Sequence, residues 1–526
     1  MNSPLFRSLA AAAALLTLST PVLADTWSSN TTSGNPIRTS TTTTKVGIGI
    51  TGTATVKNML DVEGAAVVGS SYSGTNTAPA NGLLVQGNVG IGTTSPASGV
   101  RLDVNGIIKG DGSQVSNVAP AGSFSVRQYG ALPNNTGTDY TTQFQNALNA
   151  AASVGAIVYI PPGQYTVNGN LSIPRGVTLQ GAWQGPHDAQ LDRGTTLRTT
   201  AGAGNATGTP FITLAVDAAV RGLTVFYPNQ TNPASIQAYP YTIRMTSDGD
   251  VENVTLANSF QGIFATENSH FIRNVNMTAF SRGVTIDACF DIGRLENVHI
   301  HPKFLFTATG WAWSTPTTGN LGQIVNYTIR NLVGYSFGMT DWQEVNGCFV
   351  IWSQIGMQFI PGATSGSPNV TIVNSGVDVS QMAVVVNASE QWTGISFLNC
   401  QFVGQHILNA SAGPVKYTNC AFHPGNLPEN PNVVTALIWS DLSSTLSLTS
   451  CLFWDWDQPG VGHAAITMNH GVTFLSGCEF KAHPGKRHIN LYNNANLRAV
   501  NTRFGHTLNW GNAGTGTADF WGSVTQ

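Results

Sequence analysis

The sequence predicts an all-β protein built mainly as a parallel β-helix, and two observations predict it. Gly accounts for 57 of the 526 residues and only 9% of the residues are charged, which is typical of turn-rich β proteins. The second observation is a repeat: residues 251–256 (VENVTL) realign with 272–277 (IRNVNM) and with 295–300 (LENVHI), at offsets of 21 and 23 residues. A repeat of this length without a helix indicates a solenoid whose apolar positions stack inward.

The first 24 residues predict a secretory signal peptide. Arg7 supplies the positive charge, an apolar stretch follows, and small residues precede a cleavage site near Ala24. We therefore expect a secreted, cell-surface or periplasmic protein. No later apolar run is long enough to span a bilayer, so no membrane span is expected. Residues 25–44 are a Ser/Thr/Asn-rich linker that cannot bury a core.

Residues 45–122 contain two copies of one small unit. The segment VGIG at 46–49 matches VGIG at 89–92, and LDV at 60–62 matches LDV at 102–104. Each unit predicts a pair of short strands that is too small to fold alone and needs neighbours to bury its apolar face. The repeats resemble the stalk repeats of phage tail fibres and large bacterial surface proteins, and this resemblance implies a homotrimer.

From residue 123 to residue 526 the sequence predicts the β-helix itself. Helical periodicity is confined to residues 141–152, and short β runs follow at regular spacing. Near the carboxyl end the repeat becomes NCQF at 399–402, NCAF at 419–422, SCLF at 450–453 and GCEF at 477–480. The aligned Cys and Phe residues are interpreted as internal stacks, with buried thiols favoured over disulfides despite the oxidising compartment.

The start of this region resembles the pectate-lyase superfamily of proteins related to glycoside hydrolase family 28. The similar segments are FQNA at 144–147, AAA at 150–152, GAIVYIPPGQY at 155–165 and GVTLQG at 176–181. The resemblance implies a right-handed parallel β-helix whose first coil is capped by the short helix. It also implies a polysaccharide hydrolase, a polysaccharide lyase or a phage tailspike. The chain lacks the Asn-Thr-Asp, Gly-His-Gly and Arg-Ile-Lys motifs of polygalacturonases, so their catalytic residues cannot be transferred.

Acidic residues are concentrated in the segment GVTIDACFDIGRLENVHIHP, residues 283–302. Glu296 shares its coil position with Arg273 and Glu252, which predicts a surface ladder of alternating charge, extended by Arg221. The asparagines that follow, Asn253, Asn274 and Asn297, predict a second ladder at a turn. Glu296 is therefore interpreted as part of the scaffold.

The alignment gives Asp287 a different environment. It falls opposite Thr266-Glu267 on the preceding coil, and Asp248 falls near the same turn one coil earlier still. Like charges so close are costly in a scaffold but useful as a general acid and a base or nucleophile. We predict Glu267, Asp287 and Asp291 as catalytic residues and Asp248 as a substrate ligand. The alternative is that all four are solvated turn residues.

A segment that breaks the coil period begins after His301. Long insertions on a β-helix commonly build the walls of a binding groove. His301, Trp311 and Trp313 are predicted to hold substrate, the tryptophans by stacking on sugar rings, and Glu344 is a further ligand at a similar level. The alternative is that the tryptophans cover an apolar strip or a subunit contact.

Together these features predict a polysaccharide-degrading glycoside hydrolase that uses paired carboxylates and no cofactor or metal. Two alternatives remain: a polysaccharide lyase, which would use Arg or Lys as base together with calcium, and a glycan-binding adhesin without catalysis. The net charge of −3 and the absence of a basic run exclude an electrostatic footprint for nucleic acid.

Overall fold

The computed structural model of the 526-residue chain describes residues 46–48, 60–62, 64–96, 101–105, 123–182, 193–230, 232, 234–302, 318–409, 413–425, 436–458, 460–481 and 484–525. The predicted signal peptide and linker lie outside these residues. The chain divides into two units, Met1–Gln114 and Val115–Gln526.

Among its described residues, the amino-terminal unit contains three separate pairs of parallel strands. The repeat seen in the sequence is preserved in the register: Val46 pairs with Leu60 in the first copy, and Val89 pairs with Leu102 in the second. Its strands are β1 (Val46–Ile48), β2 (Leu60–Val62), β3 (Ala66–Val68), β4 (Leu83–Val85), β5 (Val89–Ile91) and β6 (Leu102–Val104). Each pair is only three residues long, so it leaves apolar side chains exposed.

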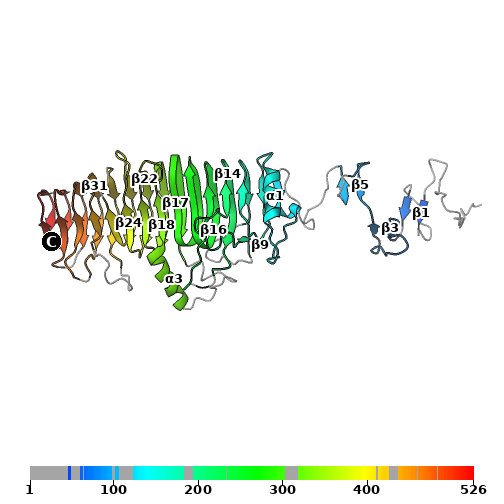
Figure 1. Cartoon of the computed structure of the whole chain (residues 1–526), viewed down its shortest axis with the longest axis horizontal. Helices are drawn as coiled ribbons and strands as arrows, with labels where there is room; N and C mark the ends of the chain where they lie inside the picture. The colour runs from blue at the N-terminus through cyan, green and yellow to red at the C-terminus, as the bar shows by residue number, and fades with distance from the viewer. Residues whose placement is uncertain are drawn as a thin grey trace, which may run out of the picture. The chain divides into compact units, whose positions relative to one another are not determined.

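The second unit begins with strand β7 (Ser123–Ser125), a 3-10 turn (Val126–Tyr129) and helix α1 (Thr141–Ala151). The helix was predicted over 141–152 and ends one residue earlier. Its apolar residues recur at helical spacing, and Phe144, Ala147, Leu148 and Ala151 are buried against the first coils. Helix α1 covers one end of the stack of strands (Figure 1), as expected of a capping helix.

The strands from β7 onward form one parallel network of 35 strands, which confirms the predicted right-handed parallel β-helix. Each coil contributes to three faces, which we call face 1, face 2 and face 3. Three strands run through more than one face: β14 (Ala218–Phe226), β16 (Gly249–Glu267) and β17 (His270–Ile300).

The remaining strands each belong to one face. Face 1 contains β7, β8 (Ile157–Tyr159), β11 (Thr178–Gln180), β19 (Thr340–Asn346), β22 (Pro368–Val373), β25 (Ile395–Leu398), β28 (Val415–Thr418), β31 (Thr445–Thr449), β34 (Val472–Ser476), β37 (Asn496–Val500) and β40 (Ala518–Trp521). Face 2 contains β9 (Gly163–Thr166), β12 (Thr195–Arg198), β20 (Phe349–Ile351), β23 (Gly376–Asp378), β26 (Gln401–Val403), β29 (Ala421–His423), β32 (Leu452–Trp454), β35 (Glu479–Lys481), β38 (Arg503–Phe504) and β41 (Val524–Thr525). Face 3 contains β10 (Leu171–Ile173), β13 (Ile212–Leu214), β15 (Tyr241–Met245), β18 (Val333–Phe337), β21 (Ile355–Phe359), β24 (Met382–Val386), β27 (Gln405–Leu408), β30 (Ile438–Ser440), β33 (Ala464–Met468), β36 (Arg487–Leu491) and β39 (Trp510–Asn512).

In the twelve coils from Gly222 to Gly522, a single left-handed residue turns the chain from face 1 to face 2. It has a φ between 49° and 66° and is Asn, Gly or Ser, the types that tolerate this conformation. The predicted asparagine ladder lies in this column: the Asn274 amide donates to Asn253 at 3.0 Å, and Asn297 donates to Asn274 at 2.9 Å. The full column is Gly222, Asn253, Asn274, Asn297, Gly347, Asn374, Asn399, Asn419, Ser450, Gly477, Asn501 and Gly522.

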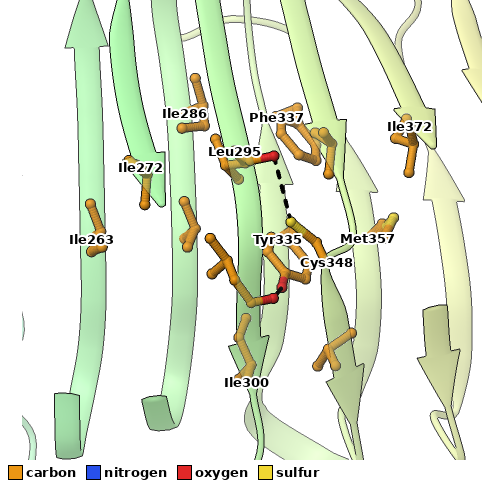
Figure 2. Close-up of a cluster of buried hydrophobic side chains, with 14 of the residues drawn as sticks. Ile263, Ile272, Ile286, Leu295, Ile300, Tyr335, Phe337, Cys348, Met357 and Ile372 are labelled. Atoms are coloured by element: carbon orange, nitrogen blue, oxygen red, sulfur yellow. Dashed lines mark hydrogen bonds between the residues drawn. The ribbon is translucent and has the colours of Figure 1, made fainter. Parts of the chain in front are cut away.

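From Gly222 to Asn501 the residue after each left-handed position points into the core, and five of the six cysteines are found there, while the sixth, Cys289, is buried and free at another turn. Cys348, Cys400, Cys420, Cys451 and Cys478 are buried and free, as the repeat predicted, and each thiol approaches the carbonyl two residues earlier at 3.3–3.8 Å. Figure 2 shows Cys348 and Tyr335 among the stacked aliphatic side chains, with Cys348 close to a second carbonyl, that of Leu295. Burial raises the pKa of the Cys348 thiol to about 12, so it remains protonated.

The predicted Phe column is also internal. Phe422, Phe453 and Phe480 stack with ring centroids 5.0 and 4.3 Å apart and nearly parallel planes. Outside the coils, helix α3 (Thr318–Asn331) follows the segment that interrupts the coil period and projects from one side of the stack (Figure 1). It packs Ile324 and Tyr327 near Phe280 in a small separate apolar cluster.

We predict that Phe453→Ala lowers the free energy of unfolding by about 3–5 kcal/mol, because it leaves a cavity between two stacked rings. Trp454→Ala, at the next residue, is the control: Trp454 is 48% exposed, and its contact with the Lys481 ammonium is worth only about 1 kcal/mol. Urea unfolding measures both. Equal losses for the two variants would contradict the internal stack.

The buried histidines predict a specific acid sensitivity. Burial lowers the pKa of His406 from 6.5 to about 3, so the unfolded chain takes up a proton at a higher pH than the folded one. Stability is therefore lost as the pH falls from about 6.5 to about 3, by about 1.4 kcal/mol per pH unit for this residue. The double variant His406→Phe/Tyr417→Phe removes the imidazole without orphaning the Tyr417 hydroxyl, which lies 2.9 Å from His406 Nδ1.

We expect this double variant to lose less stability than the wild type between pH 6.5 and pH 4. Unfolding curves across that pH range measure the difference. A His463→Gln variant, which alters an exposed histidine, is the control. An unchanged pH dependence in the double variant would mean that His406 is not buried as a neutral imidazole.

Candidate functional site

A groove crosses the outer surface of face 1 where β14, β16 and β17 run side by side. Its volume is about 490 Å³, and it combines acidic, basic and aromatic side chains with backbone. Its lining residues are Asp217, Ala218, Asp248, Gly249, Asp250, Ser269, His270, Phe271, Ile292, Arg294 and Glu296. They belong to four successive coils, which the parallel register brings together.

Arginines and carboxylates alternate along one edge of this groove. Arg221 contacts Asp250 at 2.7 Å and Glu252 at 3.5 Å, and Glu252 also pairs with Arg273 on the next coil. The hydrogen bond between the Arg273 and Glu252 side chains is the main cause that raises the pKa of Arg273 above its ordinary value, and the charges of Glu252 and Glu296 add to it. The predicted charge ladder is therefore present, and Glu296 lies within it.

Asp248 lies in the groove with its carboxylate facing the next coil. It accepts hydrogen bonds from the Ser269 hydroxyl at 2.6 Å and the Ser269 amide at 3.2 Å, and Asn268 donates to it at 3.4 Å. The hydrogen bond from the Ser269 side chain is the main cause that lowers the pKa of Asp248. Asp248 is therefore an ionised carboxylate at neutral pH, suited to accept hydrogen bonds or a proton.

Aromatic side chains lie beside these charges. The Arg273 guanidinium lies 5.0 Å from the centre of the Phe271 ring, and Trp342 is 59% exposed on the neighbouring coil, in register with Ile292. Glu344, predicted as a substrate ligand, is on the same face and pairs with Arg294 at 3.4 Å. The groove can therefore offer a ring face as well as charged hydrogen-bonding groups.

Asp287 has three backbone partners. Its Oδ1 accepts from the amides of Ala288 and Met339 at 2.8 and 2.9 Å, and its Oδ2 accepts from the amide of Ala363 at 3.0 Å. The carboxylate therefore joins three parts of the chain across successive coils. Sequence alignment placed Asp287 correctly in register with Thr266, next to Glu267, but it gave no sign of these partners.

The other predicted catalytic residues are at the surface. Glu267 is exposed at a turn with a φ of 74°, and Asp291 is exposed with its carboxylate 2.7 Å from the amide of Ile292. The predicted turn region is shared by Asp248, Glu267 and Asp287. The carboxylate oxygens of Asp248 and Asp287, however, accept hydrogen bonds from backbone amides of later coils. Catalysis by Glu267, Asp287 and Asp291 stays a prediction.

His301 lies on the outer surface of face 2, away from the face 1 groove. Its ring stacks on Phe349 with centroids 6.2 Å apart and lies 5.9 Å from the Trp352 ring. Trp311 and Trp313, predicted to work with His301, lie outside the described residues.

Sequence analysis missed Asp250 and Phe271 as groove residues. They pair in register and flank the inward-pointing Val251 and Ile272. Strict alternation along these strands was the available signal, since it places Asp250 and Phe271 on the outer surface in one column.

Within the described ranges, no group of three or more His, Cys, Asp or Glu residues is placed to hold a metal ion. None of the helices there has the length and apolar character needed to cross a bilayer.

We predict that Asp287→Asn lowers the free energy of unfolding by about 1–3 kcal/mol, because an amide cannot accept all three backbone hydrogen bonds. Glu267→Gln, at the adjacent exposed turn, should change it by no more than about 0.5 kcal/mol. Chemical denaturation measures both. If Asp287→Asn were as stable as the wild type, its carboxylate would not be joining the coils.

A family model described as rhamnogalacturonase A/epimerase, pectate lyase-like, matches residues 123–294. Among solved structures, the A-module of mannuronan C-5 epimerase AlgE6 from Azotobacter vinelandii is 13% identical and covers 77% of this chain and 99% of its own, with a TM-score of 0.34. The tailspike protein gp49 of Pseudomonas phage LKA1 is 14% identical and covers 76% of this chain and 81% of its own, with a TM-score of 0.42.

None of the curated proteins matches the chain. The family match spans the capping helix, the first coils and most of the face 1 groove. Residues 123–294 are thus similar to the rhamnogalacturonase A/epimerase family, which confirms the predicted resemblance, and the chain carries a pectate-lyase-like right-handed β-helix.

Proposed function

We propose that the protein binds a polysaccharide in the face 1 groove and hydrolyses it with carboxylates of that groove. The observation that carries the proposal is one open groove of about 490 Å³ that contains an ionised Asp248 together with Glu296 and Arg294. The similarity of residues 123–294 to a family described as rhamnogalacturonase A/epimerase supports a glycan as the ligand.

The groove chemistry suits a sugar chain. Phe271 and the exposed Trp342 offer aromatic faces on two coils that are separated by the coil of Ile292. Carboxylates and guanidinium groups bind hydroxyls through paired hydrogen bonds. The groove is open at the surface of a continuous parallel sheet, so a long chain can pass across several coils without threading through a pore.

In the proposed hydrolysis, Asp248, which is ionised and lines the groove, accepts a proton from the attacking water. A second carboxyl group must protonate the leaving glycosidic oxygen, and Glu296 in the same groove takes this role in the proposal. This assignment moves the chemistry from Asp287, whose oxygens hold backbone amides, to face 1.

Two other activities are each supported by a specific observation. Arg294 lines the groove and offers the basic group that a polysaccharide lyase needs, with calcium as its usual partner. The exposed Trp342 favours a glycan-binding protein without catalysis.

Export through the segment near Ala24 belongs to the same proposal, since a polysaccharide substrate lies outside the cell.

A homotrimer joined through the amino-terminal unit also belongs to the proposal. Leu60, Leu83 and Leu102 are 60%, 61% and 53% exposed in the three strand pairs. Three-residue strand pairs cannot bury such side chains alone, and sister chains would cover them.

The test is a polysaccharide panel assayed for new reducing ends and for the ultraviolet absorbance of an unsaturated product. We predict new reducing ends without that absorbance, and a rate reduced about 100-fold or more by Asp248→Asn or Glu296→Gln. Glu479→Gln is the control, because this residue pairs with Arg503 on face 2 several coils away. Thermal melting confirms that each variant is folded.

Each remaining outcome selects another activity. Absorbance would indicate β-elimination, and Arg294→Lys would then be the informative variant. Binding without any product would indicate a glycan-binding protein. Full activity in both groove variants would overturn the assignment of catalysis to this groove.

A further inference from the structure

A second cavity lies on the outer surface of face 2, beside Gly376, which has no side chain. One outward column of this face contains Phe349, Gly376, Gln401 and Ala421 on successive coils, in register. A Cβ at Gly376 would lie 3.3 Å from Cδ2 of Phe349 and 3.7 Å from the backbone oxygen of Gln401. The Phe349 ring therefore reaches over the glycine, a side chain at Gly376 would crowd that ring, and a notch lies beside the two residues.

The notch has a volume of about 440 Å³, which is within the range of small-molecule sites. Glycine is not required here by backbone geometry, since Gly376 is in an ordinary strand and does not have a positive φ. The glycine at this position therefore affects the space above the strand rather than the backbone conformation. The lining residues are Phe349, Asn374, Ser375, Gly376, Val377, Asp378, Asn399, Gln401 and Val403.

One wall of the notch is an aromatic ring held in place from behind. Phe349 is half-buried, and the His301 ring stacks against it with an angle of 25° between the planes. His299 lies 6.1 Å from the same ring, and Trp352 packs against His301. These contacts orient the ring, so a planar apolar platform is ready before any ligand arrives.

The rest of the rim is polar and almost uncharged. Asn374 and Asn399 belong to the asparagine ladder, where each amide uses one N–H to donate to the preceding coil, and the second N–H of each remains for a ligand. Gln401 is exposed opposite the aromatic ring. Asp378 is the one charged side chain among the lining residues.

We propose that this notch binds one pyranose ring of a neutral glycan. The apolar face of the sugar stacks on Phe349, and its hydroxyls bond to the amides of Asn399 and Gln401 and to the Asp378 carboxylate. A uronate is disfavoured, because its carboxylate would face Asp378 with no cation lining the notch. The site lies on face 2 and does not depend on the activity proposed for the face 1 groove.

The test fills the notch. Gly376→Val adds a side chain that suits a strand and occupies the space beside Phe349. Ala421→Val adds similar bulk two coils further along the same column, outside the notch, and is the matched control. The probes are neutral hexasaccharides (cellohexaose, laminarihexaose, maltohexaose and mannohexaose), with hexagalacturonate as the charged comparison, and calorimetry measures affinity in the full-length protein.

We expect at least one neutral hexasaccharide to bind more tightly than hexagalacturonate. Gly376→Val should weaken that binding by about tenfold or more, equivalent to about 1.4 kcal/mol, while Ala421→Val leaves it unchanged. Phe349→Leu keeps an apolar side chain but removes the ring face, so it should also weaken binding of the neutral hexasaccharide. If Gly376→Val does not fold, the affinity of Phe349→Leu tests the proposal.

Two results would overturn the proposal: no neutral hexasaccharide binds the wild type, or the wild-type affinity persists when both Gly376 and Phe349 are replaced. These results are separate from those for face 1. Asp248→Asn and Glu296→Gln should leave affinity at the notch unchanged, so a failed activity assay and a failed binding assay remain distinguishable.

Discussion

The structure depends on one constraint: the strands of each coil pair in parallel with those of the coils before and after, in register. Any conformation that one coil adopts must therefore recur at the same position in its neighbours. The clearest consequence is the left-handed residue between face 1 and face 2, where only Asn, Gly and Ser appear in the twelve coils from Gly222 to Gly522. A β-branched residue there would break the register of two interfaces, and the neighbouring asparagines add side-chain hydrogen bonds along the column.

The inward column that follows this turn explains why a protein predicted to be exported has buried, unpaired cysteines. In earlier coils this position is taken by Leu223, Val254, Val275 and Val298, and from Cys348 to Thr502 it is taken by small side chains that can donate to the carbonyl two residues earlier. Ser375 and Thr502 provide a hydroxyl for that carbonyl at 2.9 and 3.3 Å, and the cysteines provide a thiol in the same place. Cysteine is the more apolar of these choices and is readily buried, so packing in the core rather than redox chemistry accounts for the thiols.

Register between coils also decides which features can be predicted from the sequence. Periodicity identified the coils, the Phe stack and the ladder of Glu252, Arg273 and Glu296, because each follows from register between adjacent repeats. Helical periodicity also identified the helix near residues 141–152, whereas its capping role was implied by the resemblance to the pectate-lyase superfamily. It could not identify the partners of Asp287. Met339 and Ala363 lie 52 and 76 residues further along the chain, beyond a segment that interrupts the period. The notch at Gly376 was missed for another reason: one glycine in a glycine-rich chain carries no signal until its outward column is known.

Outward columns are not packed in the core, so their side chains can vary in polarity and charge from coil to coil, and the two cavities occupy such columns with opposite character. The face 1 groove mixes several carboxylates with arginines, whereas the face 2 notch has one carboxylate among amides. In the groove, the hydrogen bonds from Ser269 that attach Asp248 to the next coil also keep it ionised. The interaction that joins the coils therefore lowers the proton affinity of this carboxylate. It follows that a proton donor must be sought among carboxyl groups that do not accept such hydrogen bonds, and that catalysis and coil-to-coil bonding compete for the same side chains along this solenoid.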